Sequence, residues 1–193
     1  TLSWDFPDEM EVTEDIPPVR MHAISFPLPP LAHDDALAVE VMLQMLSGGT
    51  LDHFREQLVT EESGALEAFA SGSMKRSGGL MVFAAFSLPL GSADRVWREM
   101  DKALAALDEG AWMEEESLSR VSKRERRRMG INRYFADDVA TLLGWSHQNL
   151  GQASDALDRI DAMASMTLED IRLVWKSYVM EGDAIRLYAH REG

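Results

Sequence analysis

Hydrophobic and polar positions alternate with two different periods along the chain, and this separates predicted strands from predicted helices. Four segments are rich in aromatic and β-branched residues or alternate with a period of two, which is typical of strands. Between the second and third of them, "KRSGG" offers Gly78 and Gly79 for the positive φ of a hairpin turn. The segments are 20–28 (RMHAISFPL), 65–74 (ALEAFASGSM), 80–90 (LMVFAAFSLPL) and 184–190 (AIRLYAH).

Helical periodicity begins at "HDDALAVEVMLQMLSGG" (33–49), where Leu37, Val41 and Met45 recur every four residues. Asp34 is expected to cap this helix, and the Gly48–Gly49 pair to end it. Because their spacing places them on buried faces, five large residues are predicted to fill the core. These are Met42, Met45, Met100, Met163 and Trp175.

A second long helix is predicted over 92–110, from an N-cap at Ser92 to a closing Gly110. Its apolar stripe consists of Val96, Met100, Ala103, Leu104 and Leu107. Thr167 and Asp170 predict the start of the last helix, as the cap and an acidic third position. The remaining predicted helices are 51–60, 114–130, 134–147, 153–163 and 167–180.

The order strand, two helices, hairpin, several helices, strand predicts an α+β fold. We expect a mostly antiparallel sheet packed against a layer of helices. Residues 1–19 are acidic and contain proline, and we expect an extended lead-in there. Residues 20–193 are expected to form a single module, because no internal repeat or linker interrupts them.

Composition narrows the class of protein without identifying a ligand. Hydrophobic residues make up 46% and charged residues 27%, a globular balance, and no apolar run approaches the roughly 20 residues of a membrane span. The absence of cysteine excludes disulfides and cysteine nucleophiles. A net charge of −14 disfavours nucleic acid and anionic lipid as partners of the whole surface. The chain lacks an initiator Met and a signal peptide, so we expect a processed or excised piece of a longer protein.

"HFREQ" (53–57) resembles an incomplete zinc site. The inverted zinc motif H-x-x-E-H places two His ligands one helical turn apart, with a Glu as general base. Here Gln57 stands where the second His belongs, and its neutral amide is a poor zinc ligand. We therefore interpret His53 and Glu56 as polar residues of an amphipathic helix, and predict that this chain alone binds no catalytic zinc.

A basic run, "SRVSKRERRRMGINR" (119–133), is the other candidate for binding chemistry. Taken alone it suggests phosphate or nucleic-acid binding. However, acidic residues precede it along the same helix, which suits the helix dipole, and no aromatic residues interleave with it. A solvated helix face or an interdomain salt-bridge surface is therefore the favoured interpretation.

Taken in order, four segments of this sequence resemble the C-terminal, non-zinc module of the pitrilysin/insulinase family of zinc metallopeptidases, which includes mitochondrial processing peptidase. The resemblance begins near residue 18 and runs to the end of the chain. It implies the α+β fold of that family's modules, as in processing peptidases and the metalloenzyme LuxS. The four segments are HDDALAVEVMLQMLSGG, LDHFREQLVTEESGALEAFAS, LDEGAWMEEESLSRVSKRERRRM and RIDAMASMTLEDIRLVWKSYV.

The resemblance implies a module without catalytic, cofactor or metal residues of its own. Zinc would belong to a homologous partner module, in the same longer chain or in a separate subunit, and the two modules would enclose a peptide chamber. Peptide would be held by pairing of its backbone with an edge strand. A bacterial periplasm or cell envelope is the location expected by analogy with the family.

One departure from the family pattern matters for function. Active members carry in this module an Arg and a Tyr seven residues apart that hold substrate, and these positions correspond here to Val59 and Leu66. Neither side chain can donate a hydrogen bond to a developing oxyanion. The alternative is therefore a purely structural or binding subunit in which proteolysis has been lost, as in the respiratory core proteins.

Overall fold

The computed structural model describes residues 8–13, 19–46, 51–110, 112–132 and 135–190. The described part of the chain contains one five-stranded sheet with the strand order β1-β5-β2-β4-β3. The α+β fold expected from the sequence is therefore confirmed. The strands are β1 (Glu9–Thr13), β2 (Arg20–Leu28), β3 (Ala65–Lys75), β4 (Gly78–Ser87) and β5 (Ile185–His190).

The sheet is antiparallel except at one edge. β2 pairs antiparallel with both β4 and β5, and β3 pairs antiparallel with β4, whereas β1 pairs in parallel with β5. β1 lies inside the segment expected to be an extended lead-in, and its pairing in the sheet was not predicted. Its sequence, EMEVT, carries no turn signal, and its partner strand lies at the opposite end of the chain.

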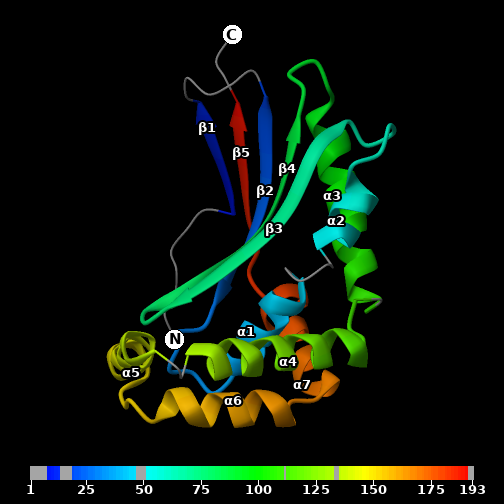
Figure 1. The fold of residues 1–193 in the computed structure, drawn as a ribbon. Coiled ribbons are helices and arrows are strands. Elements are labelled where there is room, and N and C mark those ends of the chain that lie inside the picture. Colours follow the sequence, from blue (N-terminus) through cyan, green and yellow to red (C-terminus); the bar gives the residue numbers. More distant parts are fainter. Residues whose placement is uncertain (1–7, 14–18, 47–50, 111, 133–134, 191–193) are drawn as a thin grey trace.

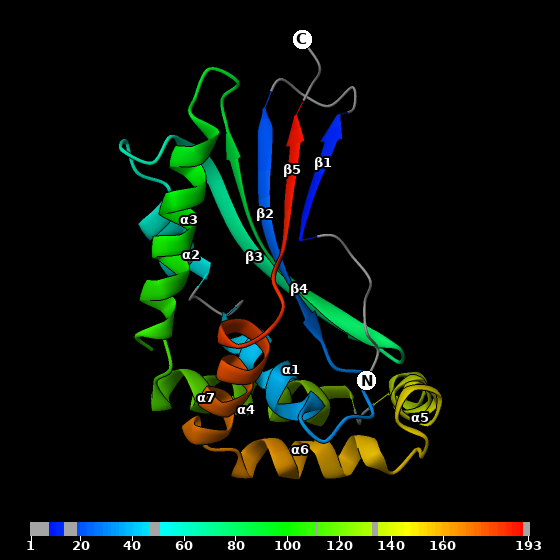
Figure 2. The same cartoon turned by 180° about the vertical axis from the view of Figure 1, so that it is seen from behind.

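Helices gather at one side and at the lower end of the sheet (Figures 1 and 2). α2 and α3 run beside the sheet, α1, α4, α6 and α7 form a layer below it, and α5 lies next to the tip of the β3–β4 hairpin in both views. The helices are α1 (Ala36–Met45), α2 (Leu51–Leu58), α3 (Ala93–Asp108), α4 (Glu115–Asn132), α5 (Ala136–Leu150), α6 (Asp155–Ser165), α7 (Leu168–Trp175) and the π-helix η2 (Lys176–Met180).

The core lies between the helices and the adjoining face of the sheet. All five large residues predicted to be core are buried, and four of the five stripe positions of α3 are buried as well. The fifth, Leu104, is partly buried and packs against the same cluster. Phe83 of β4 stands at the centre, where its ring meets those of Phe26, Phe54 and Trp175.

Two local predictions need correction. Asp34 does not cap α1, because the helix begins at Ala36 and Asp35 occupies the N-cap position without a side-chain cap bond. In the hairpin, Gly78 has a φ of +135°, but Gly79 does not have a positive φ. Gly79 is required for space instead, since a Cβ there would lie 2.5 Å from the carbonyl oxygen of Ser73. The Gly48–Gly49 helix stop lies outside the described residues.

The start of α7 confirms the predicted cap. The Thr167 hydroxyl accepts a hydrogen bond from the Asp170 amide at 3.3 Å, and the Asp170 carboxylate accepts one from the Thr167 amide at 2.8 Å. These reciprocal bonds satisfy two amide groups at the helix start. The pKa of Asp170 is lowered mainly by the Thr167 hydroxyl, which donates a hydrogen bond of 2.7 Å to its carboxylate, and also by the bond from the Thr167 amide.

Candidate functional site

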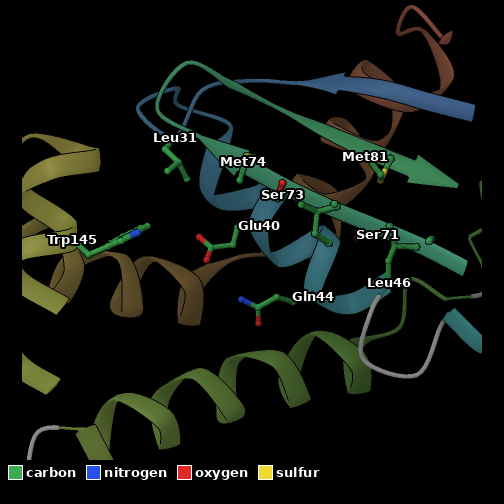
Figure 3. Close-up of a pocket in the computed structure, with 12 residues that line it drawn as sticks. Leu31, Glu40, Gln44, Leu46, Ser71, Ser73, Met74, Met81 and Trp145 are labelled. Carbon is green, nitrogen blue, oxygen red and sulfur yellow. The ribbon is translucent and has the colours of Figure 1, made fainter. Parts of the chain in front are cut away.

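An open cavity of about 490 Å³ lies beside β3, between this strand, α1 and the side chain of Trp145 on α5 (Figure 3). Its volume falls within the range of about 300–1,000 Å³ typical of ligand sites. Ser71, Gly72 and Ser73 of β3 form one side, and Glu40, Leu43 and Gln44 of α1 form another.

β3 is an edge strand. Among the described residues it pairs with β4 alone, so the backbone groups along its other edge have no strand partner there. Unpaired amide and carbonyl groups of an edge strand can accept a further strand from another chain. The cavity therefore combines a backbone template with a side-chain pocket.

Gly72 lets α1 approach this strand closely. A Cβ at this position would lie 2.3 Å from Cδ2 of Leu43, which is closer than two carbon atoms can pack. Leu43 thus lies directly against the β3 backbone and forms part of the cavity wall. The absence of a side chain at residue 72 sets the distance between the helix and the strand.

The polar groups of the cavity are held by neighbours on other helices. The carboxylate of Glu40 forms an ion pair with Arg159 of α6, and the side-chain oxygen of Gln44 accepts a hydrogen bond of 2.9 Å from Arg124 of α4. Among the described residues that line the cavity, Glu40 carries the one carboxylate. Within the part of the chain that the structure describes, no cluster of three or more His, Cys, Asp or Glu side chains could hold a metal ion.

The residues of the incomplete zinc motif lie away from this cavity. The side chain of His53 lies outside the described residues, and Glu56 and Gln57 are exposed on α2. Val59 is half-buried just after α2, and Leu66 is exposed near the start of β3. The two positions expected to correspond to the family's Arg and Tyr therefore lie on either side of the turn that leads into the edge strand, and both carry hydrocarbon side chains.

The basic run forms an exposed part of α4. The guanidinium of Arg120 lies 3.4 Å from the carboxylate of Glu116 one turn earlier, and Arg124 bonds to Gln44. Lys123, Arg126 and Arg127 are exposed, while the side chains of Arg128 and Arg133 lie outside the described residues. This arrangement agrees with a solvated helix face.

His22 and Ser87 form a pair that resembles a catalytic dyad but is inaccessible. His22 Nε2 lies 3.1 Å from Ser87 Oγ, and both residues are buried. Nδ1 of His22 has no hydrogen-bond partner among the described residues, and the ring packs against Trp97 and Tyr188. Burial, with the positive charge of Arg20 as a second cause, lowers the pKa of His22 to about 4. The ring is therefore neutral at pH 7, and the pair is part of the core.

A second, smaller depression lies on the sheet face that the core does not use. It has a volume of about 290 Å³ and is bordered by Pro27, Leu80 and Ile185. Residues of this face alternate with core residues along each strand. Phe69 and Leu80 belong to it and remain 38% and 43% exposed, so the face offers an apolar surface.

Sequence reasoning did not find the cavity, although it found the elements that surround it. Trp145 was not singled out, because its importance depends on where α5 lies relative to the β3–β4 hairpin. An exposed tryptophan in a helix would have been the only sequence signal.

Among the described residues, no helix is long and apolar enough to cross a membrane.

Comparison with known proteins identifies the family. Residues 4–124 match the family model described as the peptidase M16 inactive domain, which covers more than half of the chain. The chain therefore belongs to the M16 peptidase family as an inactive domain, which confirms the resemblance to the non-zinc module. A search of curated protein sequences found no match.

Solved structures of bacterial proteins share the fold. A protease from Helicobacter pylori superposes with a TM-score of 0.74 at 18% identity, over 94% of this chain and 43% of its own. The periplasmic protease PqqL from Escherichia coli superposes with a TM-score of 0.76 at 14% identity, over 95% of this chain and 20% of the PqqL chain. The inactive peptidase domain of a protein from Bordetella parapertussis superposes with a TM-score of 0.66 at 16% identity, over 87% of this chain and 91% of the Bordetella chain.

The chain thus spans less than half the length of the first two of these relatives. Because the identities are low, the likeness establishes the fold. The non-catalytic character of the module follows from the family model.

Proposed function

We propose that this module forms one wall of a peptide-binding chamber and faces a zinc-bearing module that carries out hydrolysis. The observation that carries the proposal is the open cavity beside the free edge of β3. Zinc and the water that it activates would belong to the partner module, since this is the inactive domain of the family. The role of this chain would be to hold and orient peptide.

The free edge of β3 suggests how peptide would be held. An extended segment lying along Ser71–Ser73 would pair with the backbone of β3, and alternate side chains would point toward α1. Backbone pairing accepts many sequences, because it does not depend on side-chain identity. A chamber wall built this way would admit a range of unfolded segments.

The apolar sheet face supports the presence of a neighbouring module. Phe69 and Leu80 are exposed there, and apolar patches of this kind mark protein interfaces. The Helicobacter pylori and Escherichia coli relatives are more than twice as long as this chain, so they have room for further modules. In the parent protein or assembly, the zinc-bearing module would be such a neighbour.

A second candidate is a structural or binding subunit in an assembly without proteolysis. In its favour are Val59 and Leu66, which are expected to correspond to the family's Arg and Tyr and whose side chains offer no hydrogen-bond donor. The sequence of the rest of the parent protein or assembly distinguishes the peptidase from the structural subunit. An intact H-x-x-E-H motif in the parent supports the peptidase, and a parent without the motif supports the scaffold.

The chamber proposal is tested with the parent assembly, in which the Glu of the partner's H-x-x-E-H motif is replaced by Gln so that bound peptide stays intact. Binding of a labelled, unstructured peptide is compared with that of the same peptide carrying N-methyl groups on alternate backbone nitrogens. Methylation on the side that faces β3 should weaken binding at least about tenfold, since it removes the backbone hydrogen bonds. Methylation of the intervening nitrogens is the matched control. Equal binding of all three peptides would contradict pairing with β3.

A periplasmic or envelope location is proposed by analogy with PqqL, which is a periplasmic protease. Fractionation of cells that express the tagged parent protein tests it. Recovery of the parent with cytoplasmic markers would contradict this location.

A further inference from the structure

Trp145 is exposed, whereas the side chains of Trp112 and Trp175 lie in the core. Trp112 and Trp175 are each 2% exposed, and their indole N–H groups donate to the Leu107 carbonyl and the Asp108 carboxylate. Trp145 is 40% exposed and lies across the cavity from β3. Leaving a large aromatic side chain this open is costly, because much of its apolar surface remains in water.

The backbone around Trp145 is fixed. The next residue, Ser146, is fully buried, and its hydroxyl donates a hydrogen bond of 2.7 Å to the carbonyl of Gln152 beyond the helix end. The side chain of Asn149 donates to the carbonyl of Trp145 at 2.9 Å. These bonds anchor the last turns of α5, which carry the exposed indole.

The end of the cavity nearest Trp145 is apolar. Figure 3 shows the indole pointing toward the space below Leu31 and Met74. The Leu31 amide donates to the Lys75 carbonyl at 3.1 Å, which ties the segment before α1 to the tip of the hairpin. The nearby carboxylate of Glu40 is paired with Arg159. The cavity thus offers an aromatic face and two aliphatic side chains at this end.

We infer that Trp145, Leu31 and Met74 form a subsite for one large apolar side chain, aromatic or long aliphatic, of a peptide segment paired with β3. This inference rests on the proposed function and adds the substrate preference of the same cavity. Side chains two residues apart in a strand point to the same face about 6.5–7 Å apart. One of them would contact the indole while backbone pairing fixes the register. Trp145 is then the specificity-determining residue of the wall.

The test is a double-mutant cycle in the parent assembly with the zinc-motif Glu replaced by Gln. Two labelled unstructured peptides are used, identical except for Phe or Ala at one central position. For the wild type, the Phe peptide should bind about tenfold more tightly than the Ala peptide, in the range of a single anchor residue. In Trp145→Ala this preference should fall to about twofold or less, while affinity for the Ala peptide changes little.

Two further variants serve as controls for this cycle. Trp145→Phe keeps an aromatic face and should retain most of the preference. Leu173→Ala removes an apolar side chain that is 55% exposed on α7, away from the cavity lining, and should leave the preference unchanged. Thermal unfolding of each variant shows that its fold is intact.

The outcomes separate the inference from the proposed function. If N-methylation weakens binding but Trp145→Ala preserves the preference for Phe, peptide pairs with β3 and the aromatic subsite is wrong. If no peptide binds, or if N-methylation leaves the affinity unchanged, both the pairing of peptide with β3 and the Trp145 subsite are wrong. A preference that is lost in Trp145→Ala and kept in Trp145→Phe supports the subsite.

Discussion

The hydroxyl of Tyr178 donates a hydrogen bond of 2.8 Å to Oδ2 of Asp35, which lies 143 positions earlier in the chain. Asp35 stands at the N-cap of α1, and Tyr178 belongs to the π-helix that follows α7. The bond therefore joins the end of the helical layer to the start of α1. Burial, with the bond and charge of Asp35, raises the pKa of Tyr178 above its usual range, so the phenol stays protonated and keeps donating.

Removal of this bond should destabilise the module. Tyr178→Phe removes a donor from a carboxylate whose side chain is 46% exposed, so water can replace part of the bond, and we expect the free energy of unfolding to fall by about 1 kcal/mol. Urea denaturation measures the change. Tyr188→Phe is the matched control, since no hydrogen bond of its hydroxyl occurs among the described residues, and it should change stability by less than about 0.5 kcal/mol. Equal effects of the two variants would show that the Asp35 bond contributes nothing.

His22 should make stability depend on pH. Its pKa is about 4 in the folded module and 6.5 when unperturbed, so the unfolded chain binds more protons between these values. Stability from the neutral ring is complete above pH 6.5 and is lost as the pH falls toward 4, by up to about 3 kcal/mol. Chemical denaturation at a series of pH values measures this slope.

The control for this dependence is His22→Gln, which has no ionisable group. It should be less stable near pH 7, because the ring fills the space between Trp97 and Tyr188. Its stability should nevertheless change less between pH 6.5 and 4. Parallel curves for the variant and the wild type would rule out His22 as the source.

Two glycines, one inside α5 and one at its C-cap, should respond to the same substitution with opposite signs. Gly144 lies inside the helix and has open space around a Cβ, so Gly144→Ala should stabilise by about 0.5–1 kcal/mol. Gly151 also has open space but a φ of +106°, and Gly151→Ala should destabilise by about 1 kcal/mol. Thermal unfolding compares the pair. Changes of the same sign would show that the positive φ of Gly151 does not decide the effect of the substitution.

The isolated chain should bind no stoichiometric zinc and should not cleave peptides. Gln57 replaces a ligand of the inverted motif, and the described residues contain no cluster of metal-binding side chains. Elemental analysis of the purified chain after incubation with zinc and buffer exchange is the measurement. One tightly bound ion per chain that is lost in His53→Ala would overturn this expectation.

Local sequence signals predicted much of this fold. The stripe of α3 and the Thr167–Asp170 cap depend on residues within a few turns of one another, and both are confirmed. β1 was missed because its partner is β5, at the far end of the chain. Asp34 was assigned as a cap because no local pattern could show that the following residue is held by Tyr178.

The candidate site was harder to predict for the same reason. Its walls come from β3, α1 and α5, which meet through tertiary packing. The resemblance to the family did predict what is missing, since Val59 and Leu66 are expected to correspond to its Arg and Tyr. An absent ligand or donor can be recognised at one position, whereas a cavity requires the relative placement of several elements.

The parallel pairing of β1 with β5 bears on how the protein is made. β5 lies between β1 and β2, so β1, which is synthesised before the other strands of this sheet, cannot pair until β5 has been synthesised. Such long-range pairing slows folding and exposes strand edges in the meantime. In a nascent chain of this module, β1 would therefore remain without its strand partner until β5 emerges.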